Sequence, residues 1–207
     1  QFQFYVENLH NSTSEEDAIS NLKKIFLNIQ DGFPDEYFSI FSKYNIIDFL
    51  IDIMCNCPNT ECQIFAILII YDASFYRRTS FYGFPYIVDR DLFDKFMCAP
   101  LSINESNEID LKSPFVPLYY SKLLYLSFMY SEELAKAFYN SGFYDIFINM
   151  CLSSIDAGYI FCWADLILSF SSSSFQIPDD EKCRLIQVFQ ILYDNQYYNK
   201  YLEVVDE

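Results

Sequence analysis

Few residues in this chain have side chains that could carry out catalysis. His10 is the single histidine, so a nucleophilic Ser–His or Cys–His pair would have to use it. It lies in the polar stretch Asn8–Ser14, which we interpret as a surface loop, and a general base needs a packed site to hold it in position. His10 is therefore not predicted to be catalytic, and the chain is not predicted to be an enzyme.

Seven cysteines supply the other reactive groups. Cys55, Cys57 and Cys62 lie close together in CNCPNTEC, but this spacing lacks a Cys-x-x-Cys pair and a fourth ligand, so no metal site is predicted. The odd number of cysteines and their position in apolar runs are typical of buried, unpaired thiols, which favour a reducing, cytoplasmic location. The four glycines are isolated, so no phosphate-binding loop and no cofactor are predicted.

Composition and charge restrict the class of partner. Of the 207 residues, 52% are apolar and 20% aromatic, which is enough to form a core. The net charge of -16 argues against a nucleic-acid phosphate backbone or an anionic membrane surface as partner. The longest apolar run, Ile64–Tyr71, is too short to span a membrane, which takes about 20 residues.

Apolar residues recur mainly at three- and four-residue spacing, the period of an α-helix. Ser14 and Asp17 suit the capped start of a helix over Ser14–Gln30, and prolines followed by acidic residues predict helix starts at Pro34 and Pro178. Further helices are predicted over Asn45–Cys55, Cys62–Ser74, Asp89–Cys98, Phe115–Tyr130, Gly142–Cys151 and Gly158–Phe170.

The segment that begins at Asn45 recurs along the chain. A shift of 97 residues aligns Asn45 with Gly142 and Asp48 with Asp145. A shift of 43 residues aligns the same segment with Asp89–Cys98. Each copy is followed by a second, longer apolar helix. Units of about 40–50 residues with two or three helices are typical of helical solenoids.

The segment Lys43–Ser74 resembles one repeat of the armadillo family. The third helix of that repeat reads Q-x-x-A-x-x-x-L-x-N, and Gln63, Ala66, Ile70 and Asp72 stand at its four positions. Where the family prefers glycine before the second helix, this chain has Asn45, and Gly142 restores the glycine in the later copy. A HEAT-type or other helical-hairpin array stays open as an alternative.

The resemblance implies an all-α, right-handed α-solenoid of about four degenerate armadillo-like repeats over residues 1–207. Residues 1–13 would form a polar lead-in, 99–113 an inserted loop and 171–177 a linker before the terminal helices. In peptide-binding members of the family, a Trp and an Asn on successive third helices hold an extended peptide. Leu68 and Asp72 occupy these positions here, so recognition by that ladder is not expected.

One row of side chains is predicted to face the concave groove of the solenoid. This row is apolar for a solvated surface, and exposed apolar patches above a few hundred Å² usually mark a partner surface. The alternative is that the helical phase differs by one residue and that these side chains belong to the core. The predicted partner-binding residues are Glu61, Phe65, Leu68, Asp72, Tyr120, Leu123, Ser127, Tyr130, Phe161 and Ala164.

Together these expectations describe a protein-interaction scaffold with an apolar, acidic-rimmed groove and no catalysis. Its expected partner is a protein with a basic or amphipathic segment, because an acidic exterior attracts positive charge. The alternative is a structural subunit permanently built into a larger assembly, such as a cytoskeletal one. An obligate subunit should associate through its apolar ends when isolated, since terminal repeats need polar caps to stay apart.

Overall fold

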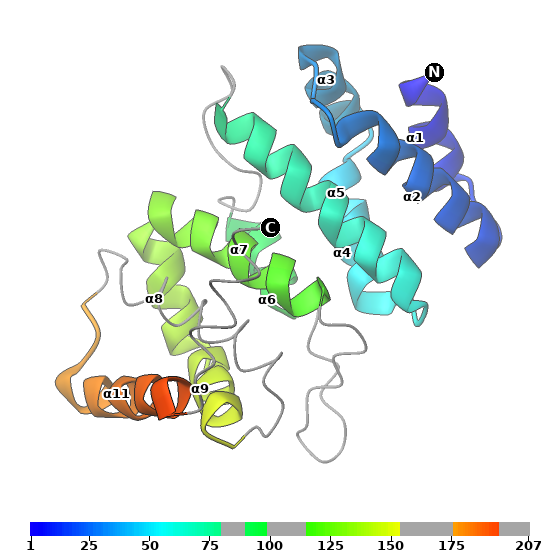
Figure 1. Cartoon of the computed structure of the whole chain (residues 1–207). Helices are drawn as coiled ribbons and strands as arrows, with labels where there is room; N and C mark the ends of the chain where they lie inside the picture. Colours follow the sequence, from blue (N-terminus) through cyan, green and yellow to red (C-terminus); the bar gives the residue numbers. More distant parts are fainter. Residues whose placement is uncertain (80–89, 99–114, 154–175, 195–207) are drawn as a thin grey trace. The chain divides into compact units, whose positions relative to one another are not determined.

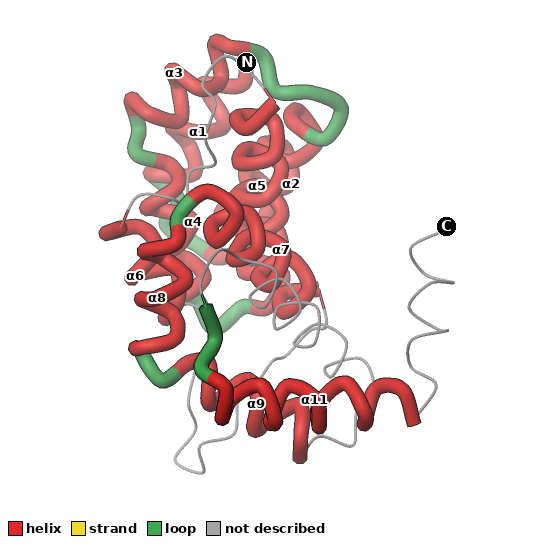
Figure 2. The backbone as a smooth tube through the Cα atoms, turned by 90° about the vertical axis from the view of Figure 1, so that its left-hand side faces the viewer, coloured by secondary structure: helices red, strands yellow, loops and turns green. Residues whose placement is uncertain are grey.

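The computed structural model describes residues 1–79, 90–98, 115–153 and 176–194. All regular secondary structure within these ranges is α-helical (Figures 1 and 2). The predicted all-α fold class is thus confirmed. The chain divides into two compact units, Gln1–Leu123 and Leu124–Glu207, with the boundary inside α7 (Phe115–Tyr130). One continuous repeat domain over residues 1–207 stays a prediction.

The first unit begins with a helix where the sequence analysis expected a polar lead-in over residues 1–13. In α1 (Phe2–His10), Phe2, Val6 and Leu9 are buried at helical spacing. The Phe2 ring stacks on Tyr37 with ring centroids 3.7 Å apart. The lead-in prediction was wrong because three apolar residues at the right spacing bind α1 to its neighbours, although polar residues surround them in the sequence.

The next two helices agree with their predicted start signals. Before α2 (Glu15–Ile29), Ser14 Oγ accepts a hydrogen bond from the backbone N–H of Asp17 at 3.2 Å. This contact satisfies one of the N–H groups that a helix start leaves open. Pro34 directly precedes α3 (Asp35–Lys43), as predicted, and the acidic residues Asp35 and Glu36 lie in its first turn.

Two apolar helices, α4 (Ile46–Asn56) and α5 (Thr60–Thr79), form the centre of the first unit. α4 packs against α3, α5 and α6 (Arg90–Cys98), as expected for a helix that is apolar on nearly all sides. α5 packs against both α2 and α4, and α2 runs beside it in Figure 1. The buried face of α5 consists of Cys62, Ala66, Ile67, Ile69, Ile70, Ala73 and Ser74.

The second unit contains α8 (Glu132–Asn140), α9 (Phe143–Ser153) and α11 (Asp179–Asp194), and α9 packs against the other two. α11 begins directly after Pro178, as its start signal predicted. α8 was not predicted from the sequence. Ser131 caps its start, and Ser131 Oγ accepts a hydrogen bond from the N–H of Leu134 at 3.4 Å. The loop over 99–113, the helix over 158–170 and most of the linker over 171–177 lie outside the described residues.

The corner before α4 and the corner before α9 have the same backbone structure. Asn45, at φ 48°, and Gly142, at φ 83°, both adopt the left-handed conformation. The N–H of Asn45 donates to the Ser42 oxygen at 3.3 Å, and 97 residues later the N–H of Gly142 donates to the Tyr139 oxygen at 3.5 Å. The correspondence predicted from the sequence is therefore present in the backbone.

An ionic contact between helices accompanies each of these two corners. In the first unit, Lys95 Nζ on α6 lies 2.6 Å from Asp48 Oδ1 and 3.2 Å from Asp52 Oδ1 on α4. In the second, an η nitrogen of Arg184 on α11 lies 2.5 Å from Asp145 Oδ1, and the other η nitrogen lies 3.1 Å from the oxygen of the Asn149 side chain on α9. The shift of 97 residues relates Asp48 to Asp145, so the two units repeat a polar contact as well as a corner.

Candidate functional site

The half-exposed side of α5 carries residues that the sequence analysis predicted to bind a partner. They follow one another at spacings of three and four residues, so they lie on one side of the helix. The first is exposed and the other three are half-buried, whereas the opposite side of α5 lies in the core. We call this set the α5 surface: Glu61, Phe65, Leu68 and Asp72.

α2 borders the α5 surface at its N-terminal end. Lys23 Nζ lies 2.6 Å from Glu61 Oε1 and 5.6 Å from the centroid of the Phe65 ring. The Phe26 ring lies 5.8 Å from the Phe65 ring. Lys23 and Glu61 are both about half exposed, so their ion pair adds little to stability. This end of the α5 surface therefore combines an apolar ring with a solvated ion pair.

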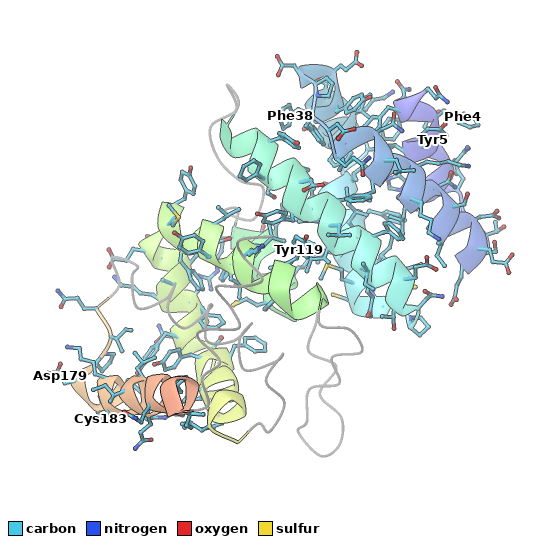
Figure 3. The ribbon with its side chains drawn as sticks, viewed as in Figure 1. Phe4, Tyr5, Phe38, Tyr119, Asp179 and Cys183 are labelled. Atoms are coloured by element: carbon cyan, nitrogen blue, oxygen red, sulfur yellow. The ribbon has the colours of Figure 1, made fainter. Side chains whose placement is uncertain are left out.

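α7 borders the same helix further along. Tyr119, labelled in Figure 3, lies on α7. Its ring meets the Tyr71 ring edge-on with centroids 5.0 Å apart, and the centroid of the Phe75 ring lies 6.3 Å from that of Tyr71. The ammonium of Lys122 lies 5.3 Å from the centroid of Tyr119 and 5.8 Å from that of Tyr71, within the range of a cation–π contact. We call Tyr71, Phe75 and Tyr119 the aromatic cluster.

Asp72 stands next to the aromatic cluster in an unusual electrostatic setting. Burial raises the pKa of its carboxyl group to about 6, and no neighbouring cation or hydrogen-bond donor in the described structure offsets that effect. Burial raises the pKa of Tyr119, and the nearby charge of Asp72 adds to this effect. A partly buried carboxylate with a shifted pKa is a candidate functional residue.

The predicted row is not exposed where it continues on α7. Tyr120, Leu123 and Ser127 are fully buried, so their assignment to an open groove was wrong. Tyr119 and Lys122, each one residue earlier, are half-exposed instead. Lys122 is the one charged residue of α7 and the rest of its sequence is mostly apolar, so the pattern gave little indication of which side faces the core. The alternative left open from the sequence, a phase difference of one residue, therefore holds for Tyr120 and Leu123, whereas Leu126, one residue before Ser127, is also buried.

The remaining predicted residues do not extend the site. Tyr130 is 38% exposed and belongs to the second unit, whereas the α5 surface belongs to the first. Phe161 and Ala164 lie outside the described residues. The predicted partner-binding residues did not include Tyr71, Phe75, Tyr119 or Lys122. A signal for them was present in the tyrosine pair at 119 and 120, but a helical pattern cannot tell which of two adjacent aromatic residues is exposed.

The candidate catalytic and metal-binding residues have structural contacts. His10 ends α1 instead of lying in a loop, and its Nε2 lies 2.9 Å from the backbone oxygen of Tyr44, while its ring lies 4.3 Å from Phe49. Cys62 is buried as predicted, but Cys55 is exposed. Burial raises the pKa of the Cys62 thiol to about 12, which keeps it unreactive. No cluster of metal-ligating side chains occurs in the described ranges.

Comparison with protein-family profiles, with characterised proteins and with solved structures found no match to this chain. Among the helices described, none combines the length and the apolar character that crossing a bilayer requires. The candidate site is thus defined by its own geometry: an apolar strip along α5 with a solvated ion pair at one end, and a carboxylate beside aromatic rings at the other.

Proposed function

We propose that this chain is a protein-interaction scaffold, built as a right-handed armadillo-like α-solenoid of about four repeats. Its partner is a polypeptide with a basic or amphipathic segment, which binds along the α5 surface. The chain holds this partner without carrying out chemistry on it.

The repeated corners support the solenoid arrangement. The residues before α4 and α9 share a left-handed backbone and the same hydrogen bond, and both helices make a polar contact with a helix of a later segment. Units that repeat the same contacts with their neighbours are typical of stacked helical arrays. In such an array successive third helices line one face, and α5 is the third helix of the segment that resembles an armadillo repeat.

The observation that carries the functional proposal is the exposure of the α5 surface. Phe65 and Leu68 are apolar side chains that the fold leaves half open to solvent, with Glu61 and Asp72 four residues away on either side. Apolar side chains with a charged rim are typical of protein–protein interfaces. The net charge of -16 would speed the approach of a basic partner.

Site-specific photo-cross-linking tests this proposal directly. A benzophenone amino acid at position 68 should form a discrete covalent adduct with one partner protein in extracts of the source cells. The same amino acid at Asp31, which is exposed in the turn between α2 and α3, should not form that adduct. Leu68→Asp should abolish binding of the captured partner while the melting temperature changes by no more than about 2 °C, because Leu68 is only half-buried. Equal cross-linking at both positions would contradict the proposal.

A second candidate function is a permanent structural subunit of a larger assembly. It is favoured by two exposed apolar side chains on the first two helices, Phe4 at 59% and Leu27 at 60% exposure. Exposed apolar side chains promote association between copies or with other subunits. Sedimentation of the isolated chain separates the two functions: a concentration-dependent oligomer that Leu27→Asp dissociates supports the structural subunit, and a monodisperse monomer supports the scaffold.

A further inference from the structure

Asp72 holds a negative charge in a half-buried position without a compensating charge. Within the described part of the chain, no ion pair or hydrogen bond involves its carboxylate, and burial is the sole cause of its raised pKa. Two other carboxylates of this unit do pair with a cation on a neighbouring helix: Glu61 pairs with Lys23, and Asp48 pairs with Lys95. A carboxylate partly removed from water is costly unless a cation compensates it. The surroundings of Asp72 are therefore suited to a cation that comes from outside the chain.

The aromatic cluster beside Asp72 already binds one ammonium group. Lys122 Nζ lies 5.3 Å and 5.8 Å from the centroids of Tyr119 and Tyr71. Aromatic ring faces attract ammonium groups because the face of the ring carries negative potential. Lys122 does not contribute to the pKa of Asp72, so its charge does not neutralise that carboxylate. The cluster thus shows that an ammonium group fits here while the carboxylate stays unpaired.

α5 also provides an apolar surface on which the methylene groups of a long cationic side chain can pack. Leu68 and Phe75 lie four residues before and three residues after Asp72, so all three share one side of α5. Leu68 is half-buried and Phe75 is 38% exposed. A lysine side chain places its methylene groups on apolar surface and its ammonium at the polar edge. This side of α5 matches a lysine side chain: Leu68 and Phe75 can contact its apolar methylene groups, and Asp72 can pair with its ammonium group.

From this geometry we infer that Asp72, flanked by Leu68 and Phe75 on α5 and by Tyr119 on α7, is a subsite for a lysine side chain of the partner polypeptide. The ammonium pairs with Asp72 and the methylene groups pack on Leu68 and Phe75. This inference rests on the proposed scaffold function, and it specifies which chemical group of the partner the α5 surface recognises.

A nuclear magnetic resonance titration of the full chain tests the subsite without knowledge of the partner. The probe is N-acetyl-lysine methylamide, and the control is N-acetyl-norleucine methylamide, which has a similar apolar stem but no ammonium. At pH 7.5 the lysine compound should shift the resonances of Asp72 and of the Tyr119 ring, and the norleucine compound should shift them at least fivefold less. Equal shifts from both compounds would overturn the inference. The arginine analogue shows whether a guanidinium is accepted as well: weaker shifts than with lysine support the assignment to lysine, and stronger shifts contradict it.

Two variants act on the subsite in opposite directions. Asp72→Asn should weaken binding of the lysine compound about three- to fivefold, as expected for loss of a partly exposed ion pair. Lys122→Met should strengthen binding, because it removes a like charge from beside the aromatic cluster. Asp31→Asn removes the same charge as Asp72→Asn from an exposed turn, and should change the affinity less than twofold. Equal losses in the two aspartate variants would show that only the net charge of the chain matters.

The two proposals can fail separately. If position 68 cross-links a partner and Asp72→Asn binds that partner with unchanged affinity, the scaffold function stands and the lysine subsite is wrong. If the lysine compound binds as expected but position 68 captures no protein, the subsite stands and the role of the α5 surface in the cell is wrong.

Discussion

The hydroxyl group of Tyr120 donates a hydrogen bond to the backbone oxygen of Met97 at 3.0 Å, inside the core of the first unit. The Tyr120 ring also stacks on Phe96, with centroids 4.7 Å apart. Tyr120 thus joins α7 to the last turn of α6 through both an apolar and a polar contact. A buried hydroxyl is tolerated in a core when it finds such a partner.

We predict that Tyr120→Phe lowers the free energy of unfolding by about 1 kcal/mol, because it leaves the Met97 oxygen without this donor while keeping the ring. Tyr119→Phe is the matched control. Tyr119 is half-exposed on the neighbouring position of α7, so its loss of a hydroxyl should change stability by less than about 0.5 kcal/mol. Urea denaturation followed by circular dichroism measures both. A larger loss for Tyr119→Phe than for Tyr120→Phe would contradict the burial of Tyr120.

The adjacent tyrosines also show the limit of what the sequence could predict. The ends of α7 were predicted correctly, but the side that faces the core was not, because nearly every position of this helix is apolar. On α5 the polar residues Glu61 and Asp72 mark one side, and there the predicted row lies on the half-exposed side of the helix. The side of a helix that faces the core can be predicted from its sequence only where polar residues interrupt the apolar pattern.

Local signals predicted helix starts better than they predicted tertiary contacts. Ser14 and Pro34 mark helix starts through chemistry confined to a few neighbouring residues, and both predictions were confirmed. The helix α1 was missed although Phe2, Val6 and Leu9 have helical spacing, because part of what holds it, the contact of Phe2 with Tyr37, joins residues 35 positions apart. The position of Asp72 beside the aromatic cluster was not predicted for the same reason, because its neighbour Tyr119 belongs to another helix.

The left-handed corner before α9 should depend on the identity of residue 142. Gly142 has a φ of 83°, and a Cβ placed there would meet no atom within 4 Å, so the cost of a substitution is conformational and not steric. Gly142→Ala should therefore destabilise the protein by about 1 to 2 kcal/mol. Gly142→Asn should cost less, because asparagine tolerates this conformation, as Asn45 does at the equivalent corner. Thermal denaturation of the two variants measures the difference, and equal destabilisation would show that the corner can relax to another conformation.

The contact of Lys95 with Asp48 should couple α6 to α4 weakly and in a salt-dependent way. A double-mutant cycle with Lys95→Met and Asp48→Asn should give a coupling energy of about 0.5 kcal/mol at low ionic strength, because both groups are partly exposed. The coupling should decrease at 1 M salt, where exposed charges are screened. The pair Arg90–Asp94 within α6 is the control: its loss should leave the α4–α6 contact intact. A coupling energy that does not change with salt would rule out an ionic origin.

The burial of Asp72 should make stability depend on pH in a direction opposite to that of most aspartates. Its pKa is about 6 in the folded protein, against 3.8 for an ordinary aspartate, so the folded state holds the proton more tightly than the unfolded state does. The contribution of Asp72 to stability is therefore most favourable below pH 4, declines as the pH rises from about 4 to about 6, and stays constant above. Tyr119, the neighbouring group whose pKa is raised, does not titrate in this range.

Comparison of the wild-type chain with Asp72→Asn isolates this effect, because asparagine resembles the protonated acid and carries no charge at any pH. The variant should match the wild type near pH 4 and melt at a higher temperature at pH 7.5. Glu7 and Asp179, whose pKa values are lowered by hydrogen bonds, shift the stability of both proteins equally and cancel in the difference. Asp31→Asn, at an exposed site, should show a difference from wild type that changes little with pH. If the Asp72→Asn difference is also constant from pH 4 to 7.5, the carboxylate is compensated in solution, and the subsite inferred for a lysine side chain loses its electrostatic basis.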